Sequence, residues 1–457
     1  MAARAARSLE PGLNAQAPSA VPDRLTSRTV LTIAVPMAIA NVSAPLTGAI
    51  DTAVIGQTGQ AHLIGAVALG STIFTLIYWG FGFLKIGTAA LTAQAGGRQE
   101  PAEIASSLAR ALLIALAVGL ALILLQQPIA KAVFWFLEGS EAVEREARIL
   151  YDIRIWSAPA ALANYALTGW FLGLRRAGTA LMLQIGLNLC NTVLSFVFVL
   201  GLGWGVAGVA AGTVIAEWSA ALAGLLIAWR LTRAALPRRA DVLDTARLKR
   251  LFAVNRDVLI RTFCLLAAFT FFTAEGARMG DVTLAANAVL MHFFLISAYL
   301  LDGFESAAQT LVGQAVGAGQ RQRYREAVWL TTLWSGAVAF TLAALIWLSA
   351  PFVFRIMTTA EDVRGLAAVY LPWAALTPIA GFAAFQLDGI FIGATRTADM
   401  RNMMIVSLAA YFAAWAVLTG PFGNHGLWAA MIVFFVVRAF TLLVRLPALE
   451  RAWFGRP

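Results

Sequence analysis

The sequence predicts an all-α polytopic membrane protein whose twelve transmembrane helices form two six-helix lobes. The chain of 457 residues is 60% hydrophobic and only 13% charged, whereas soluble domains average about a quarter charged residues. Its apolar runs number twelve, and two segments of its first half recur in its second half. A water-soluble globule of this size is therefore excluded, and a bundle of spanning helices is the remaining class.

The predicted spans are apolar runs of about 20 residues separated by short polar segments. The first six are 29–50, 63–84, 105–126, 153–174, 180–201 and 206–229, and the last six are 257–277, 285–308, 327–348, 368–394, 402–420 and 426–446. The second and eighth helices are expected to continue toward 95 and 315. The length of each run indicates a helix that crosses the bilayer.

One polar connection is much longer than the others and divides the chain. Residues 230–256 are rich in Arg and separate an N-lobe at 29–229 from a C-lobe at 257–446. Residues 1–28 are polar and lack the apolar segment of a signal peptide, so we interpret them as a disordered cytoplasmic tail. Residues 447–457 are expected to form a second cytoplasmic tail.

The distribution of Lys and Arg predicts the orientation. With both termini inside, the cytoplasmic segments hold about three times as many Lys and Arg residues as the outside loops, which agrees with the positive-inside rule. The outside set is Lys131, Arg145, Arg148, Arg154, Arg278, Arg355 and Arg364. The rule also explains the net charge of +10, so nucleic-acid binding is not expected. The short tail lacks organelle-targeting composition, which favours the bacterial cytoplasmic membrane.

The two halves contain a repeat at one fixed offset of 220 residues. Residues 165–176 align with 385–396, and residues 91–97 align with 311–317. Because six spans separate the copies, both copies enter the membrane in the same direction, which makes the repeat parallel. Two similar lobes around a central cavity are typical of a carrier that alternates its access between the two sides.

Ionisable side chains inside membrane spans are costly and are functional by default. Asp51 lies deep in the first apolar segment, and no Lys or Arg lies within twenty positions of it. Desolvation disfavours a charged carboxylate, so such a group can take up a proton or bind a sodium ion. The alternative is that Asp51 ends the helix in water. Pro36 and Pro45 precede it and either make this helix bendable or give it a static kink.

The fifth span carries a polar stripe. Gln184, Asn188, Asn191 and Ser195 recur at helical spacing and share one face. Amides in a span either join helices or line a cavity, and the length of the stripe favours a cavity. Glu217 in the sixth span is a second buried acid of the first half.

The second half has its own acids within the spans, namely Glu275, Asp302, Glu305 and Asp388. Asp302 and Glu305 are three residues apart and share a helix face. Arg261 and Arg438 are candidate counter-ions. If they pair with the acids, those acids are structural, and the sequence leaves this open.

No catalytic, metal or nucleotide site is indicated, so the protein is not expected to be an enzyme or to carry a cofactor. The cysteines and histidines lack the spacing of a disulfide framework or a metal site; they are Cys190, Cys264, His62, His292 and His425. No phosphate-binding Gly-rich loop of the ATPase type occurs. The energy source is therefore expected to be an ion gradient.

Several motifs resemble one transporter family over nearly the whole chain, from about 29 to 446. They are PLTGAIDTAVIG (45–56), GAVALGSTIF (65–74), GFLKIGTAALTAQA (82–95), NRDVLIRT (255–262), AANAVL (285–290), LVGQAVGAG (311–319) and LDGIFIGATRTADMRN (387–402). The sequence resembles the DinF branch of the multidrug and toxic compound extrusion (MATE) family. The resemblance implies the MATE/MOP flippase-like fold and antiport of organic cations or amphiphiles against H⁺ or Na⁺, by a protein that often works as a monomer in the lipid bilayer.

The resemblance also assigns residues. Asp51 matches the family's functional aspartate, Pro36 matches the hinge proline at which the first helix can bend on protonation, and Asn188 and Asn191 match asparagines around the N-lobe cavity. The family pattern usually has an Asp where this chain has Ser195.

The missing acid affects the expected coupling ion. A sodium ion prefers more oxygen ligands and more negative charge than Asp51 and neutral partners offer, which favours proton coupling, with Na⁺ near Asp51 as the other reading. Glu217 substitutes for the lost acid if it reaches the same cavity. Ion coupling is thus assigned to Asp51 and Glu217.

The expected function is a secondary active exporter of small organic cations or amphiphiles. The expected substrate and ion cavity contains the stripe of the fifth span together with Asp302, Glu305 and Asp388. The alternative function is a flippase for a lipid or a lipid-linked substrate. A flippase would need a basic cavity for a phosphate, whereas the cavity candidates are mostly acids and amides.

Overall fold

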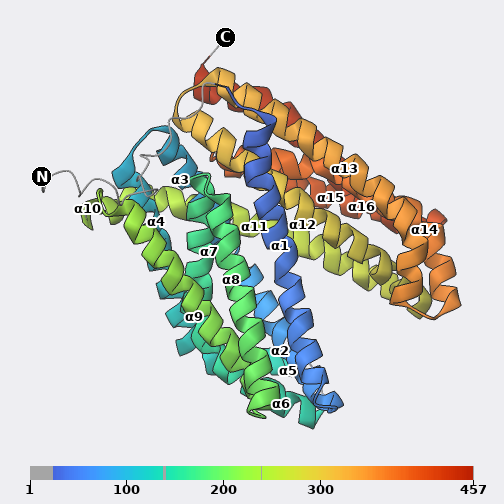
Figure 1. Ribbon diagram of the computed structural model, residues 1–457. Coiled ribbons are helices and arrows are strands. Elements are labelled where there is room, and N and C mark those ends of the chain that lie inside the picture. The colour runs from blue at the N-terminus through green and yellow to red at the C-terminus, as the bar shows by residue number, and fades with distance from the viewer. Residues whose placement is uncertain (1–23, 137–139, 238, 456–457) are drawn as a thin grey trace, which may run out of the picture.

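The computed structural model describes residues 24–136, 140–237 and 239–455, and this part of the chain is almost entirely helical (Figure 1). Among the described residues, eleven helices are long and apolar enough to cross a membrane, and no strand is present. One more span, the fourth in chain order, brings the number to twelve. It consists of η1 (Ile155–Ser157) and α7 (Ala158–Gly173), which continue α6 (Glu141–Arg154) without a break. The predicted fold of twelve spanning helices is therefore confirmed.

The N-lobe contains the helices before residue 233. Besides α6, η1 and α7, they are α1 (Ser27–Gly56), α2 (Ala61–Trp79), α3 (Phe83–Gly97), α4 (Pro101–Leu124), α5 (Gln126–Phe136), α8 (Ala177–Ser195), the short π-helical η2 (Phe196–Gly201) and α9 (Gly205–Thr232). The second span is interrupted between Trp79 and Phe83, at a segment with two glycines. It then continues as α3 to Gly97, beyond its apolar run.

The C-lobe consists of six long helices. They are α11 (Thr245–Arg278), α12 (Asp281–Gly317), α13 (Arg321–Met357), α14 (Glu361–Gly393), α15 (Thr397–Phe422) and α16 (Asn424–Phe454). The connection between the lobes is shorter than the predicted segment 230–256, because α9 runs to Thr232 and α11 begins at Thr245. Between them lies the single turn α10 (Arg239–Val242).

The two predicted tails differ from the expectation in different ways. Residues 1–23 of the predicted tail 1–28 lie outside the described residues, and α1 begins at Ser27. Residues 447–454 continue α16 instead of forming a tail. Contacts explain this extension, because Leu449 is buried and the Glu450 carboxylate pairs with Arg321 at 2.6 Å and with Arg325 at 2.8 Å.

Close helix packing repeats in the two lobes and confirms the parallel repeat. Gly169 of α7 lies against the backbone of Lys85 in α3, so closely that a Cβ atom would overlap the Lys85 carbonyl oxygen. Gly389 of α14 lies in the same way against the carbonyl oxygen of Glu305 in α12. Both pairs are related by the offset found in the sequence. Glycine at these positions permits the backbones to approach.

The lobes meet at the end of the molecule where α1 begins and α16 ends, which we call the termini end, and their helices diverge toward the opposite end (Figure 1). Reciprocal amide contacts hold the lobes together there. Gln94 Nε2 donates to the Gly393 carbonyl at 2.9 Å, and Gln314 Nε2 donates to the Gly173 carbonyl at 3.1 Å. The two bonds are related by the repeat, so the pseudo-twofold axis passes through this contact.

Two glycines at the termini end permit the two lobes to approach closely. Replacing either of them is expected to destabilise the protein. A Cβ atom at Gly97 would overlap the carbonyl oxygen of Gln314, and one at Gly317 would overlap that of Gln94. Backbone atoms cannot move aside as a flexible side chain can. Overpacking typically costs about 1–3 kcal/mol, so we expect Gly97→Ala to lower the thermal unfolding midpoint of the purified protein. The matched control is Gly178→Ala, where a Cβ atom meets nothing within 4 Å; equal midpoints for both variants would contradict the prediction.

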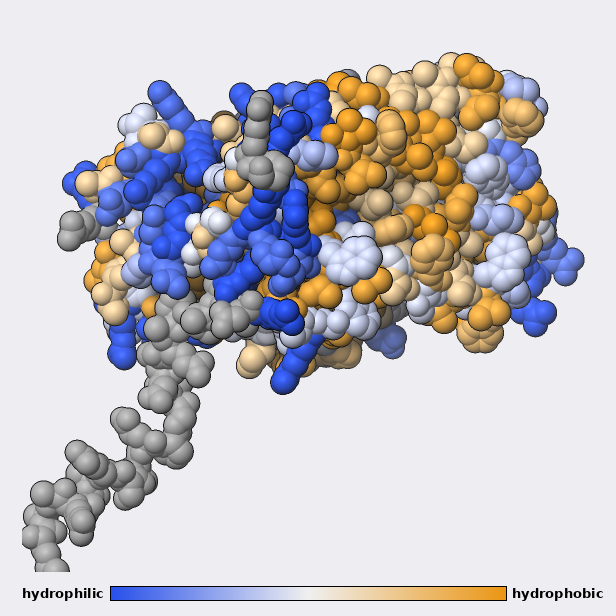
Figure 2. Space-filling model, turned by 90° about the horizontal axis from the view of Figure 1, so that it is seen from above, coloured by the Kyte–Doolittle hydropathy of each residue, from blue (hydrophilic) through white to orange (hydrophobic). Residues whose placement is uncertain are grey.

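The surface separates into a polar end and an apolar flank. Figure 2 views the termini end, where hydrophilic side chains gather, while the side of the C-lobe is covered by hydrophobic ones. Large apolar side chains are exposed on helices of the C-lobe, for example Trp329, Phe340 and Leu348 on α13 and Phe440 on α16. A soluble monomer rarely exposes so much contiguous apolar surface. This flank therefore faces the hydrocarbon of the bilayer.

Candidate functional site

The Asp51 side chain is buried near the end of α1, with 7% of its surface exposed. The Ser195 hydroxyl, at the end of α8, donates a hydrogen bond of 2.8 Å to Asp51 Oδ1. The structure thus brings together the two positions that the sequence analysis compared. Among the described residues, no group of three or more His, Cys, Asp or Glu side chains is placed to hold a metal ion.

The polar stripe of α8 continues from this pair and bonds to both neighbouring helices. Gln184 Nε2 donates to Asn188 Oδ1 at 2.9 Å, and Asn188 Nδ2 donates to the Ser43 hydroxyl of α1 at 3.0 Å. Asn191 Nδ2 donates to the Thr213 hydroxyl of α9 at 2.9 Å. The amides therefore join α8 to α1 and to α9. Gln184 and Asn188 remain half-buried, on the part of α8 that lies beside Ser43 of α1.

The Glu217 carboxyl lies in α9 and takes a different partner from Asp51. Asn164 Nδ2 of α7 donates to Glu217 Oε2 at 2.7 Å. Arg154 at the end of α6 is close enough for its charge to act on both Asp51 and Glu217, and its guanidinium lies over the Phe74 ring at 4.7 Å. The sequence analysis placed Arg154 in an outside loop and missed this proximity, since the helix that carries it is apolar on only one side.

Pro36 lies inside α1, which continues unbroken on both sides of it. Proline has no N–H to donate, so the carbonyl four residues earlier, that of Thr32, loses its helical partner. Near this point α1 contacts the C-lobe, because Gly303 of α12 lies against the Ala34 carbonyl. A change in the bend of α1 at Pro36 would therefore alter a contact between the lobes.

Two of the four C-lobe acids, Asp388 and Glu305, pair with Arg261 or Arg438, which answers for them the question left open by the sequence. Asp388 of α14 has no exposed surface and accepts from Arg261 Nε at 2.5 Å. Arg438 of α16 pairs with the same carboxylate. Arg261 also reaches Glu305 of α12, at 3.5 Å. Buried charges in such a geometry compensate one another.

Lys85 and Asp302 complete this group, which we call the charge cluster. The Lys85 ammonium donates to Asn41 Oδ1 at 3.2 Å, and the charges of Lys85 and Arg261 act on Asp302. Its members are Lys85, Arg261, Asp302, Glu305, Asp388 and Arg438. Its three basic and three acidic side chains balance in formal charge.

The repeat relates one contact of the charge cluster to another but does not preserve the Asp51 site. The offset of the repeat pairs Asn41 with Arg261 and Lys85 with Glu305, so a hydrogen bond between an ammonium and an amide in the N-lobe corresponds to an ion pair in the C-lobe. At the positions equivalent to Asp51 and Ser195, the C-lobe has Phe271 and Trp415, whose ring centroids are 4.9 Å apart. The polar pair of the N-lobe is thus an aromatic pair in the C-lobe.

Comparison with known proteins places this arrangement in one family. The sequence model of the MatE family matches residues 36–197 and 258–417. The chain is 39% identical to DNA damage-inducible protein F of Escherichia coli strain K12 over 417 residues, covering 90% of each. It is 25% identical over 437 residues to the probable multidrug resistance protein NorM of Neisseria meningitidis serogroup B, covering 91% of this chain and 93% of the relative.

A solved structure shares the fold. The outward-facing conformation of a multidrug resistance MATE family transporter of the MOP superfamily superimposes with a TM-score of 0.82 at 17% identity, covering 93% of this chain and 97% of the other. Sequence and fold agree over both lobes. This chain is therefore a multi-pass membrane protein that belongs to the MATE family.

Proposed function

We propose that this protein is a secondary active exporter that exchanges small organic cations or amphiphiles for protons. The observation that carries the proposal is the buried Asp51 carboxyl, which has a hydroxyl partner and no direct ion pair among the described residues. The names of relatives, which include multidrug resistance proteins, support the substrate class. We further propose a monomer in the bacterial cytoplasmic membrane with both termini inside.

In the proposed cycle, the charge of Asp51 couples proton and substrate. With the lobes separated at the end away from the termini, Asp51 takes up a proton and the N-lobe loses one negative charge. A cationic substrate then binds less tightly beside Gln184, Asn188 and Asn191 and leaves. Bending of α1 at Pro36 moves the contact of this helix with α12, which lets the lobes exchange their open and closed ends.

The aromatic pair of the C-lobe supports an organic cation as the substrate. Phe271 contacts Phe412 as well as Trp415, at centroid distances of 4.9 Å each. Aromatic rings attract cations through their faces. If the lobes part so that Asp51 and this aromatic pair line one cavity, that cavity would suit a molecule that is both apolar and positively charged.

Proton coupling is favoured over sodium coupling by the partners of the acids. Asp51 has Ser195 as its hydrogen-bond partner, and Glu217 is engaged by Asn164. Sodium needs several oxygen ligands. The test is efflux of a fluorescent organic cation from proteoliposomes under a pH gradient alone and under a sodium gradient alone. We expect the pH gradient to drive efflux and the sodium gradient to have no effect; the reverse result would assign sodium as the coupling ion.

Restoring the absent acid is expected to change the coupling ion. Ser195→Asp would place a second carboxylate beside Asp51, since the Ser195 hydroxyl already lies 2.8 Å from Asp51 Oδ1. Two adjacent carboxylates and the neighbouring amide oxygens form a better cation site. We expect a sodium gradient to drive efflux in this variant and not in wild type, measured in the same proteoliposomes. Ser195→Asn, which adds no charge, is the control and should not respond to sodium.

A flippase for a lipid or lipid-linked substrate is the alternative. Lys85, Arg261 and Arg438 would provide positive charge for a phosphate. They are balanced by three acids in the charge cluster, which makes this function less favoured. Movement of a fluorescent lipid analogue across the proteoliposome bilayer, with no efflux of an organic cation under either gradient, would support the flippase instead.

A further inference from the structure

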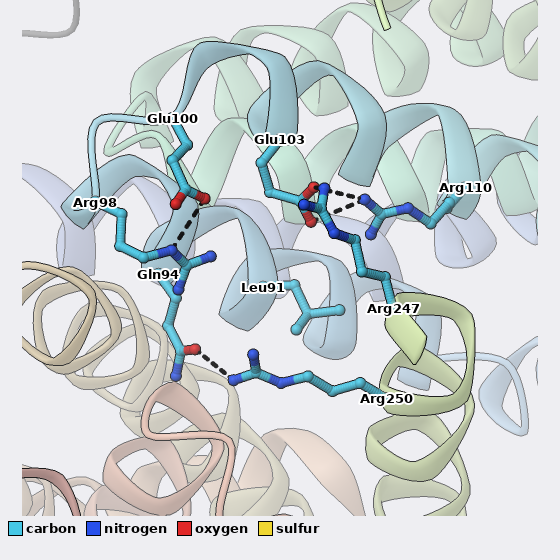
Figure 3. A pocket seen from close by; sticks show the side chains of 8 residues that line it. All are labelled: Leu91, Gln94, Arg98, Glu100, Glu103, Arg110, Arg247 and Arg250. Carbon is cyan, nitrogen blue, oxygen red and sulfur yellow. Dashed lines mark hydrogen bonds and ion pairs between the residues drawn. The ribbon is translucent and has the colours of Figure 1, made fainter. Parts of the chain in front are cut away.

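A pocket of about 230 Å³ lies at the termini end, where both lobes contribute to it (Figure 3). One wall is formed by the end of α3 and the start of α4, and the other by the first turns of α11. It is separate from the Asp51 site and from the charge cluster, and none of its residues has a part in the proposed transport cycle.

Arginine is in excess in this pocket. Four arginines and two glutamates line it, which leaves two positive charges uncompensated within the lining. Arg98 pairs with Glu100 at 3.0 Å. Glu103 is shared, because Arg110 pairs with it at 2.8 Å and Arg247 also pairs with it.

Arg250 is the cation without a carboxylate partner among the described residues. Its Nη2 donates to neutral acceptors, Gln94 Oε1 at 2.7 Å and the Thr395 hydroxyl at 2.8 Å. Burial and the charge of Arg98 disfavour its positive charge, whereas the charge of Glu103 favours it. Figure 3 shows Arg250 and Arg247 extending from α11 toward α3 and α4. An anion between these side chains would relieve the repulsion.

A buried donor beside the pocket also lacks a partner. Only 1% of Arg110 is exposed, and its Nε makes no hydrogen bond within the described part of the chain. Buried polar groups are almost always hydrogen-bonded, and exceptions call for an explanation such as an absent ion. The Nε atom is enclosed by protein and does not open into the pocket, so it is the guanidinium charge of Arg110, a residue of the lining, that would act on an oxyanion there.

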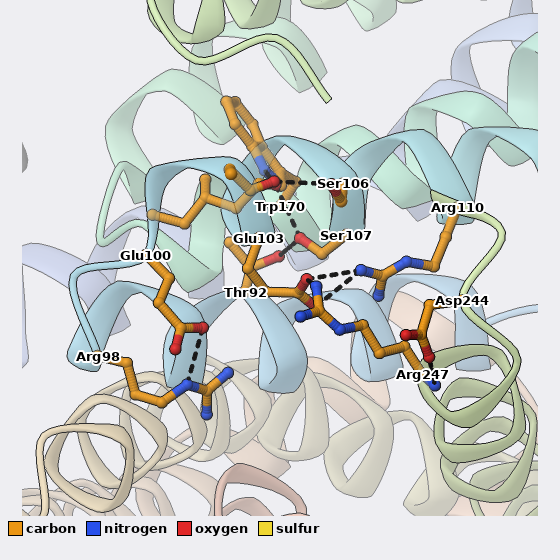
Figure 4. A network of polar contacts seen from close by, with 12 residues as sticks. Thr92, Arg98, Glu100, Glu103, Ser106, Ser107, Arg110, Trp170, Asp244 and Arg247 are labelled. Atoms are coloured by element: carbon orange, nitrogen blue, oxygen red, sulfur yellow. Dashed lines mark hydrogen bonds and ion pairs between the residues drawn. The ribbon is translucent and has the colours of Figure 1, made fainter. Parts of the chain in front are cut away.

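Helix contacts hold the wall that carries Arg110 in place (Figure 4). The hydroxyls of Thr92 in α3 and Ser107 in α4 are 3.0 Å apart, and Trp170 Nε1 of α7 donates to the Ile104 carbonyl of α4 at 2.9 Å. The pocket also adjoins the N-terminus of α4, whose partial positive charge favours anions. The site is therefore formed before any ligand binds.

We propose that this pocket binds the phosphate group of an anionic ligand and thereby links α11 to α3 and α4 when the lobes are closed at the termini end. Arginine forks match phosphate oxygens in geometry and charge. The volume suits a phosphate or a small headgroup. Two sources share this chemistry, a phospholipid headgroup and free inorganic phosphate. The exposed apolar side chains of Leu236, Leu243 and Phe252, in the segment that carries the two α11 arginines, are compatible with a lipid.

The test measures binding to the purified full-length protein in neutral detergent. The probes are inorganic phosphate, dioctanoyl phosphatidylglycerol and, for comparison, dioctanoyl phosphatidylcholine. We expect saturable binding of one anionic probe per protein and a rise of the dissociation constant on the order of a hundredfold in Arg247→Gln/Arg250→Gln, because this variant loses two charge-assisted bonds to the anion. Lys249→Gln, an exposed cation on the same helix that does not line the pocket, is the matched control and should bind as wild type.

The outcomes distinguish the two sources of the phosphate group, and some of them contradict the proposal itself. Binding of phosphatidylglycerol but not of phosphate indicates a lipid headgroup, and binding of both indicates that phosphate alone suffices. Absence of saturable binding, equal affinity for phosphatidylcholine, or an equal effect of Lys249→Gln and the double variant overturns the proposal. The unfolding midpoint without ligand, compared between wild type and the double variant, shows whether the variant is folded. Because this binding does not depend on the coupling ion or substrate, its failure would leave the proposed transport function untouched.

Discussion

Asp51→Asn is expected to abolish gradient-driven efflux while the protein remains in the membrane. Asparagine has nearly the size and shape of aspartate and can still accept the hydrogen bond from Ser195. It cannot take up or release a proton. If the charge of Asp51 is what links substrate to the proton gradient, efflux of a fluorescent organic cation under a pH gradient falls to the rate of protein-free liposomes.

Two controls distinguish loss of coupling from loss of structure. Asp51→Glu keeps the carboxyl and should retain measurable efflux, whereas Asp281→Asn, at an exposed position at the start of α12, should transport as wild type. Equal unfolding midpoints for wild type and Asp51→Asn would show that the fold is intact. Efflux in Asp51→Asn at a rate near wild type would remove the role proposed for this residue.

The number and order of the spans could be predicted from the sequence because apolar length and the repeat encode them directly. Helix ends could not, because they depend on contacts. The sequence analysis ended the last span at 446, yet α16 reaches Phe454, where Glu450 binds two arginines of α13. A polar segment appears as a tail until its partners on another helix are known.

The sequence indicated which residues belong to the Asp51 site, but it did not indicate which of them contact one another. Asp51 and Ser195 were singled out on separate spans, and their hydrogen bond depends on how α1 crosses α8. Asn164 and Thr213, which bond to Glu217 and Asn191, carried no signal in an apolar background. An isolated small polar residue on a span is common and gives no indication of its partner.

The charge cluster could have been predicted further from the repeat. The offset that relates the glycines also relates Lys85 to Glu305 and Asn41 to Arg261. The contact of Lys85 with Asn41 is thus equivalent to the contact of Glu305 with Arg261. Applying the repeat to charged positions as well as to glycines would have placed Lys85 with the acids. The convergence of Arg261 and Arg438 on one carboxylate depends on three helices and needed the structure.

Asp388→Asn is expected to destabilise the protein strongly, whatever its effect on transport. Asp388 has no exposed surface and compensates Arg261 and Arg438, of which Arg438 is also fully buried. Removing one partner of a buried ion pair leaves an uncompensated charge, which costs about 3–5 kcal/mol. We therefore expect a marked fall in the thermal unfolding midpoint of the purified protein in detergent.

The repeat provides the matched control for this variant. Thr168 occupies the position equivalent to Asp388 in the N-lobe, and Thr168→Val removes a polar group there without leaving a charge unpaired, so its effect should be much smaller. Asp388→Asn/Arg438→Gln removes one charge of each sign and should recover part of the lost stability, because Arg261 then keeps Glu305 as its partner at 3.5 Å. If Asp388→Asn is as stable as Thr168→Val, the carboxylate is not what holds the two arginines, and Glu305 and Asp302 must compensate them. Recovery in the double variant together with retained efflux would show that Asp388 is structural, which separates the charge cluster from the coupling step at Asp51.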